Sequence, residues 1–132
     1  MRDKKKIILG VSVCVVIVVL LVLFIPKKSV FFYNNNAESI EKITMMNGNT
    51  GDIIYVSSED YEYVLSYLDD YTFTPDYFRK TKDGWGYRFT ITSSGKKVDM
   101  FFTGINVEID GVKYKCTNSS GTSLDEIWEN VK

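Results

Sequence analysis

An unbroken apolar run over residues 7–25, with basic residues on both sides, constrains this 132-residue chain more than any other feature. In helical form the run spans roughly 28 Å, close to the thickness of one hydrocarbon core. It therefore predicts a single transmembrane helix. The rest of the chain is then assigned to one side of a membrane.

Basic residues are more numerous before the apolar run than after it. Residues 2–6 hold four basic side chains opposed only by Asp3, whereas Lys27 and Lys28 follow the run. Short cytoplasmic segments carry the excess of basic residues in single-pass proteins. The bias predicts that residues 1–6 are cytoplasmic and that the C-terminal part is extracytoplasmic, in the cell membrane.

A cleaved signal peptide is the main alternative to a membrane anchor. Its apolar region is usually shorter and ends in small residues at the cleavage site. Here the run closes on the bulky residues 21–25, followed by Pro26. A lipoprotein signal is also disfavoured, because Val13 stands where a small residue would precede Cys14. These features favour a retained signal-anchor.

Composition bounds the part of the chain beyond the anchor. After Lys28 the sequence holds ten basic and sixteen acidic residues. An acidic domain is a poor candidate for binding nucleic acid or anionic lipid headgroups, so we expect no nucleic-acid partner. About 100 residues suffice for one domain with its own core and are too few for two.

Residues 26–39 are expected to form a juxtamembrane linker. Asn34, Asn35 and Asn36 resist regular structure. The aromatic segment 30–33 is β-prone and predicts a short strand, while an aromatic belt at the membrane interface is the alternative.

The sequence pattern of residues 40–71 predicts a hairpin followed by a helix. Residues 40–46 and 52–56 are β-prone and flank a dense turn signal at residues 47–51. Residues 57–60 combine serines with carboxylates, as at a helix start. The apolar stripe of that helix has helical spacing and consists of Tyr61, Val64, Leu65, Leu68 and Tyr71. Tyr63 and Tyr67 lie beside the stripe and are expected to be exposed.

The second part predicts an antiparallel meander and a final helix. Pro75 within residues 72–82 favours an irregular segment with at most a short edge strand. Period-two alternation then predicts four strands whose inward residues are Trp85, Tyr87, Phe89 and Ile91; Val98, Met100 and Phe102; Ile105, Val107 and Ile109; and Val112, Tyr114 and Cys116. Cys116 is therefore expected to be a buried, inert thiol. Ser123 and Glu126 fit a capping box, and Trp128 is expected to dock the last helix onto the sheet or the first helix.

These elements together predict an α+β fold over residues 40–132. A mostly antiparallel sheet is covered on one face by two helices. The opposite face is expected to be solvated, and it carries Arg88, Thr90, Thr92, Asp99, Phe101, Thr103, Asn106, Glu108, Lys113 and Lys115.

The stretch Gly84-Trp85-Gly86-Tyr87-Arg88-Phe89 precedes the predicted meander in a chain rich in Lys, Asn, Ile and Tyr. With a basic start, one anchor and a small ectodomain, this layout resembles uncharacterised single-pass surface proteins of low-GC Gram-positive bacteria. The resemblance covers residues 40–132 and implies a surface domain of unknown function. It implies no activity and no site residues.

Several common chemistries are excluded by composition. The chain has no histidine, which removes Ser-His and Cys-His pairs and most zinc sites. No Gly-rich phosphate loop occurs. Ser93 and Lys96 match a Ser-x-x-Lys pattern, but they lie in a predicted hairpin turn instead of on a helix. We therefore expect no cofactor and no metal.

The main hypothesis is a non-enzymatic binding module on a membrane anchor that binds a protein, a peptide or a wall component, with a surface or membrane protein as the expected partner. A complete small fold without a catalytic constellation favours it. The expected contact surface is the polar sheet face around Arg88, Phe101 and Lys113, where Phe101 is the odd apolar residue.

Two alternatives stay open. The first is a carboxylate-based cell-wall hydrolase that uses Asp69, Asp70, Asp99 and Glu108. The second is an accessory subunit of a membrane complex whose transmembrane helix is the working part. That helix contains the small residues Gly10 and Ser12 but no Gly-x-x-x-Gly pattern.

Overall fold

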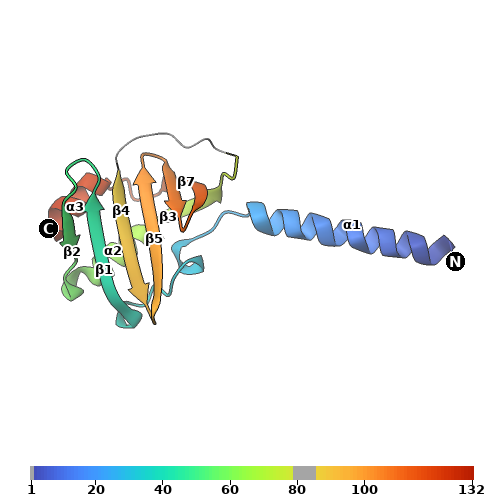
Figure 1. Cartoon of the computed structure of the whole chain (residues 1–132), viewed down its shortest axis with the longest axis horizontal. Helices are drawn as coiled ribbons and strands as arrows, with labels where there is room; N and C mark the ends of the chain where they lie inside the picture. Colours follow the sequence, from blue (N-terminus) through green and yellow to red (C-terminus); the bar gives the residue numbers. More distant parts are fainter. Residues whose placement is uncertain (1, 79–85) are drawn as a thin grey trace.

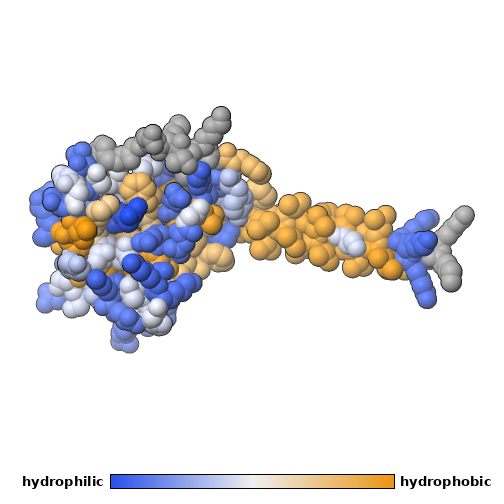
Figure 2. All heavy atoms as spheres, in the orientation of Figure 1, coloured by the Kyte–Doolittle hydropathy of each residue, from blue (hydrophilic) through white to orange (hydrophobic). Residues whose placement is uncertain are grey.

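A long N-terminal helix extends away from the rest of the chain (Figure 1). The computed structural model describes residues 2–78 and 86–132. Helix α1 (Arg2–Phe24) includes a stretch, Asp3–Phe24, that is long and apolar enough to cross a membrane. Its side chains are exposed along the helix, which forms an apolar rod in Figure 2. A signal sequence near an N-terminus has the same properties, so α1 is compatible with an anchor or a signal.

Pro26 explains where α1 ends. The residue before a proline, here Ile25, is driven out of helical backbone geometry. The last residue of the helix is therefore Phe24. At the other end α1 includes the basic residues that precede the predicted span of 7–25, so the helix begins earlier than the apolar run does.

The domain that follows is built on one antiparallel sheet. Within the described residues it has seven strands in the order β2-β1-β4-β5-β6-β7-β3. The strands are β1 (Ile40–Asn47), β2 (Ile53–Tyr55), β3 (Tyr71–Pro75), β4 (Tyr87–Ser93), β5 (Lys96–Thr103), β6 (Asn106–Ile109) and β7 (Val112–Asn118). The predicted meander is confirmed as β4–β7 and the predicted hairpin as β1–β2. The hairpin joins the meander through β1 and β4.

Strand β3 lies at the sheet edge that is nearer to α1, as Figure 1 shows. Pro75 ends the strand, and an edge position tolerates its missing N–H. The other side of β3 is not open, because Lys27 pairs with Phe73 there. Lys27 N–H donates to the Phe73 carbonyl at 2.7 Å, and Phe73 N–H donates to the Lys27 carbonyl at 2.8 Å.

Two helices contribute to the buried core against one face of the sheet (Figure 1). They are α2 (Tyr61–Asp69), preceded by the 3-10 turn η3 (Ser58–Asp60), and α3 (Leu124–Val131). The predicted cap is confirmed, since Glu126 N–H donates to the Ser123 hydroxyl at 3.2 Å. Trp128 lies 5.9 Å from the Tyr87 ring on β4, and Asn130 donates to the Tyr63 hydroxyl on α2 at 2.8 Å. Helix α3 therefore contacts both the sheet and α2.

The segment expected to be a linker is packed onto the domain. It forms the 3-10 turns η1 (Ser29–Phe31) and η2 (Ala37–Ser39), so the expected strand over residues 30–33 is wrong. Phe32 and Tyr33 are buried. The Phe32 ring lies 5.5 Å from Phe73 and 5.4 Å from Tyr114, and this burial replaces the strand pairing that the local sequence favours.

Other predictions for single side chains need correction. Tyr67 is buried and not exposed. Its hydroxyl is satisfied in the core by a hydrogen bond with the Tyr71 hydroxyl at 2.6 Å. Ile105 is exposed, since it lies in the β5–β6 turn beside Gly104 and not within a strand. Cys116 is buried, as expected. The prediction for Trp85 falls outside the described residues.

Candidate binding surface

The three residues predicted to form a contact surface lie in one line across the sheet. Arg88 on β4 pairs with Phe101 on β5, Phe101 pairs with Glu108 on β6, and Glu108 pairs with Lys113 on β7. Residues directly opposite in antiparallel strands point to the same face. That face is the one opposite the buried core, because the residues on both sides of Arg88, Phe101 and Glu108 in their strands are buried.

The same line continues onto the hairpin that sequence patterning did not connect to it. Met46 on β1 pairs with Arg88, and Ile53 on β2 pairs with Met46. We call this set the outer row: Ile53, Met46, Arg88, Phe101, Glu108 and Lys113. The outer row has apolar side chains at its β2 end and charged side chains at its β7 end, with Arg88 and Phe101 between them. Figure 2 shows apolar and hydrophilic side chains interspersed on this side of the domain.

Arg88 and Phe101 form the centre of the outer row. The guanidinium carbon of Arg88 lies 5.2 Å from the centroid of the Phe101 ring. A guanidinium over an aromatic face is attracted by the negative ring quadrupole, by about 0.5–1 kcal/mol at an exposed site. The contact favours a position of the guanidinium next to the Phe101 ring, on the outer face of the sheet.

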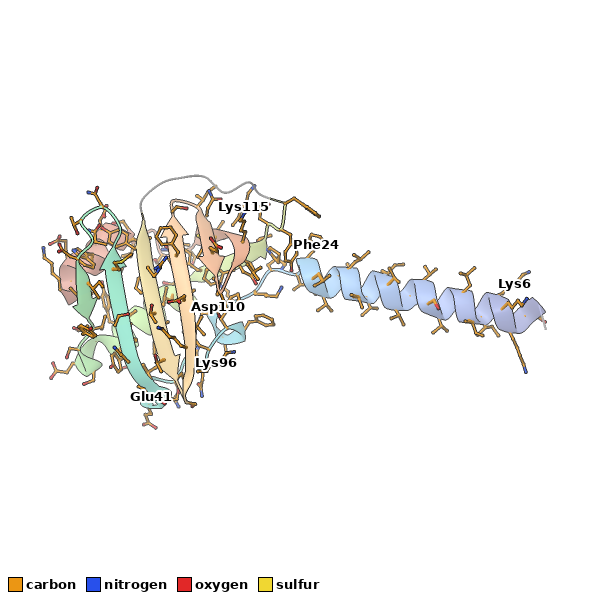
Figure 3. The ribbon with its side chains drawn as sticks, viewed as in Figure 1. Lys6, Phe24, Glu41, Lys96, Asp110 and Lys115 are labelled. Atoms are coloured by element: carbon orange, nitrogen blue, oxygen red, sulfur yellow. The ribbon has the colours of Figure 1, made fainter. Side chains whose placement is uncertain are left out.

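An open concavity of about 380 Å³ adjoins this pair. It is lined by Arg88, Asp99, Phe101, Glu108, Asp110 and Gly111. Asp99 is fixed in it, because the Thr90 hydroxyl donates to its carboxylate at 2.6 Å and its own N–H donates to the Asp110 carboxylate at 3.0 Å. Figure 3 labels Asp110, which lies at the β6–β7 turn. The concavity thus combines one cation, three carboxylates and an aromatic ring.

The β2 edge adds a second exposed aromatic contact to the same face. Tyr55 is opposite Thr44, and its side chain is 71% exposed. The Lys42 ammonium lies 4.8 Å from its ring centroid. Sequence reasoning missed Met46, Ile53 and Tyr55, because residues 53–56 read as one apolar run without alternation. Their outward parity becomes visible only when β1 is paired with β4.

The four carboxylates of the hydrolase hypothesis are not brought together. Asp99 and Glu108 share the concavity on the outer face. Asp69 lies at the end of α2 on the covered side, where its carboxylate accepts hydrogen bonds from the Ser29 hydroxyl and the Asn35 amide. Asp70 follows Asp69, and its carbonyl accepts the Ser119 N–H. Among the described residues, no group of three or more Cys, Asp or Glu side chains has a metal-binding arrangement.

Among the described residues, the clearly raised pKa values belong to buried tyrosines. Burial raises the pKa of both Tyr67 and Tyr71 above its usual value. Burial, with a hydrogen bond to the Asp125 carboxylate, raises the pKa of Tyr87 to about 12. These hydroxyls stay protonated at neutral pH and satisfy one another or a carboxylate, which is a structural role.

The stretch that carries the resemblance to Gram-positive surface proteins, residues 84–89, lies only partly within the described residues. That resemblance therefore stays a prediction.

No family model, curated protein or solved structure matches this chain. Inference about function therefore rests on the geometry of the chain itself. The outer row, which runs across six strands of the sheet, is the surface on which we base it.

Proposed function

We propose that this chain is a single-pass membrane protein whose extracytoplasmic domain is a non-enzymatic binding module. Helix α1 is the anchor, the N-terminus is cytoplasmic, and the outer row is the contact surface for a surface or membrane protein. One observation carries the proposal: Arg88, Phe101 and Lys113 lie in a single row across the sheet, and the row continues into the apolar side chains of Met46 and Ile53.

The composition of the outer row favours protein recognition over simple solvation. Arginine, methionine and aromatic residues are enriched at protein interfaces, whereas lysine and carboxylates belong to their rims. In the outer row Arg88 and Phe101 are central, with the apolar Met46 on one side of them. Glu108 and Lys113 lie toward the other end. A partner segment with an apolar side chain and a carboxylate would match this order.

The arrangement of the sheet relative to α1 favours access. In Figure 1 the β3 edge is on the α1 side, and the β2 edge is the farthest from α1. The outer row runs across the strands, from Lys113 on β7 to Ile53 on β2. With α1 in a bilayer, the row extends away from the membrane, so its apolar end is the most accessible to another protein.

The hydrolase alternative lacks a convergent set of groups. General acid–base cleavage of a glycoside needs two carboxyl groups on either side of one bond. Asp69 and Asp70 lie on the covered side of the sheet, whereas Asp99 and Glu108 lie on the outer face. Turnover of cell-wall substrate that is lost in Glu108→Gln would support an enzyme and contradict the binding module.

Orientation is tested with a membrane-impermeant protease on intact cells that carry the full chain with a C-terminal epitope. The proposal predicts loss of the epitope and a short protected fragment that contains α1. Full protection of the epitope would place the domain in the cytoplasm. An epitope found on a soluble, shortened chain would identify α1 as a cleaved signal.

Binding is tested by chemical crosslinking on intact cells and purification of the full chain. Arg88→Ala and Phe101→Ala should each reduce capture of a discrete partner at least about fivefold, as expected for central interface residues. Lys132→Ala is the matched control, because it removes a cation at the end of α3, where Lys132 pairs with Glu129. Equal capture by all four chains would contradict the assignment of the outer row.

A further inference from the structure

Tyr77 connects the domain to the last turn of α1. Its hydroxyl donates to the Leu23 carbonyl at 2.5 Å, and its ring lies edge-on to Phe24 at 5.4 Å. Phe24, labelled in Figure 3, lies at the end of α1 that meets the domain. The last four carbonyls of a helix have no partner within the helix, and in a bilayer such a carbonyl is costly to leave unpaired. Tyr77 supplies that partner from the domain.

The next residue, Phe78, is almost fully exposed. Phe78 is 89% exposed, the highest value for a large apolar side chain among the described residues. A phenylalanine loses favourable burial energy by standing in water, whereas a membrane interface accepts it. Since Tyr77 contacts Leu23, a bilayer that reaches the end of α1 also reaches the backbone that carries Phe78.

A second exposed apolar pair lies on the segment that leaves α1. Val30 and Phe31 are 61% and 65% exposed on the turn η1, next to Phe32, which is buried. The Lys27 ammonium lies 5.2 Å from the Phe31 ring centroid. Lys27 is itself paired with β3 through Phe73, so η1 and β3 are both held close to the end of α1.

We propose that Val30, Phe31, Tyr77 and Phe78 form a lipid-docking edge that inserts into the interface of the bilayer that α1 spans. This inference rests on the membrane anchor of the proposed function. Aromatic side chains are enriched at this depth, and the stems of Lys27 and Lys28 allow their ammonium groups to reach the headgroups. The partner is the lipid surface itself, and because the inserted side chains are apolar, docking does not require anionic lipid.

Docking would give the domain a fixed orientation. The β3 edge would rest on the bilayer, and the β2 edge would be held at the greatest distance from it. The outer row would then be presented at a constant height above the membrane, instead of rotating on a free tether.

The test uses the full chain with Cys14→Ala and Cys116→Ala in vesicles of phosphatidylcholine, with and without phosphatidylglycerol. Single cysteines replace Val16, Phe31, Phe78 or Tyr55, and each carries a nitroxide label. The accessibility of the nitroxide to oxygen is compared with its accessibility to a water-soluble nickel chelate. Labels at positions 31 and 78 should report interfacial lipid in both compositions, the label at 16 the hydrocarbon centre, and the label at 55 bulk water.

The four positions separate the two possible failures. Water-like values at positions 31 and 78, with position 16 in hydrocarbon, would overturn the docking edge and leave the anchor intact. A water-like value at position 16 would overturn the anchor and the docking edge together.

A second variant tests whether the two segments insert jointly. Phe78→Ser should shift the label at position 31 toward the value of bulk water, whereas Ile53→Ser, an exposed apolar residue on β2, should not. An equal effect of the two substitutions would contradict joint insertion.

Discussion

Lys27 and Phe73 exchange two backbone hydrogen bonds, so the chain that leaves α1 pairs at once with the edge of the sheet. Lys27→Pro removes one of the two donors and should destabilise the fold by about 1 kcal/mol. The Phe73 amide should also exchange its hydrogen faster, because its acceptor is held less firmly. Lys27→Ala keeps the N–H and is the control. Hydrogen exchange that is unchanged in Lys27→Pro would show that the pairing does not hold the segment.

A buried serine holds the same segment against α2. Ser29 is 1% exposed, and its hydroxyl donates to the Asp69 carboxylate. Ser29→Ala leaves that carboxylate with one donor fewer and should cost about 1–3 kcal/mol. Ser66→Ala, at an exposed position of α2, should change stability by less than about 0.5 kcal/mol. Denaturant unfolding of the full chain in detergent compares the two, and equal stabilities would contradict the packed arrangement of residues 29–33.

Gly86 is required by a close approach of backbone. A Cβ at this position would lie 1.6 Å from the Phe102 carbonyl oxygen, which cannot move without disrupting β5. Gly86→Ala should therefore destabilise the domain by more than about 3 kcal/mol. The control is Gly104→Ala, where a Cβ meets nothing within 4 Å and only the positive φ of 64° matters. It should cost about 1–2 kcal/mol. The same unfolding measurement orders the two variants, and a reversed order would contradict the β4–β5 geometry.

Burial of the Tyr67–Tyr71 pair predicts that the folded state loses stability at alkaline pH. Burial raises the pKa of both hydroxyls above the value of 10.0. The folded state therefore binds these protons more tightly than the unfolded state does. The contribution is fully present below about pH 10 and is lost as the pH rises through the folded pKa values.

The measurement is the unfolding free energy from pH 6 to pH 12. It should be level through neutral pH and decline above about pH 10. Tyr67→Phe should make the decline shallower, and Tyr55→Phe, at an exposed site, should not. A decline that begins below pH 9 would contradict the burial of this pair.

Local sequence patterns were sufficient for the elements whose partners are close in the chain. The alternation in β4–β7 and the turns between these strands specify a meander, because neighbouring strands pair. The Ser123 cap is likewise a contact between residues three apart. Pairing of β1 with β4 and of β3 with β7 joins segments that are distant in the sequence. No local pattern encodes which strand each of them pairs with.

The same distinction explains the errors. Residues 30–33 are β-prone, yet Phe32 and Tyr33 are buried. The ring of Phe32 packs against Phe73 on β3 and Tyr114 on β7, which lie far away in sequence. Tyr67 was expected to be exposed because it lies beside the apolar stripe of the predicted helix. Its partner hydroxyl belongs to Tyr71, which lies in β3 and not in the helix stripe to which the spacing assigned it. Parity along the meander identified Arg88, Phe101 and Lys113 correctly as one face, but Met46 and Ile53 could be added only from the β1–β4 register.

The central claim, that the outer row is a binding surface, is tested most directly by photocrosslinking in the native cell. A photoreactive phenylalanine analogue replaces Phe101 in the full chain and, separately, Tyr63 on the covered side. We predict a discrete protein adduct from position 101 that is absent from position 63 and is lost when Arg88→Ala is added. No discrete adduct from position 101, or the same adduct from both positions, would contradict the claim.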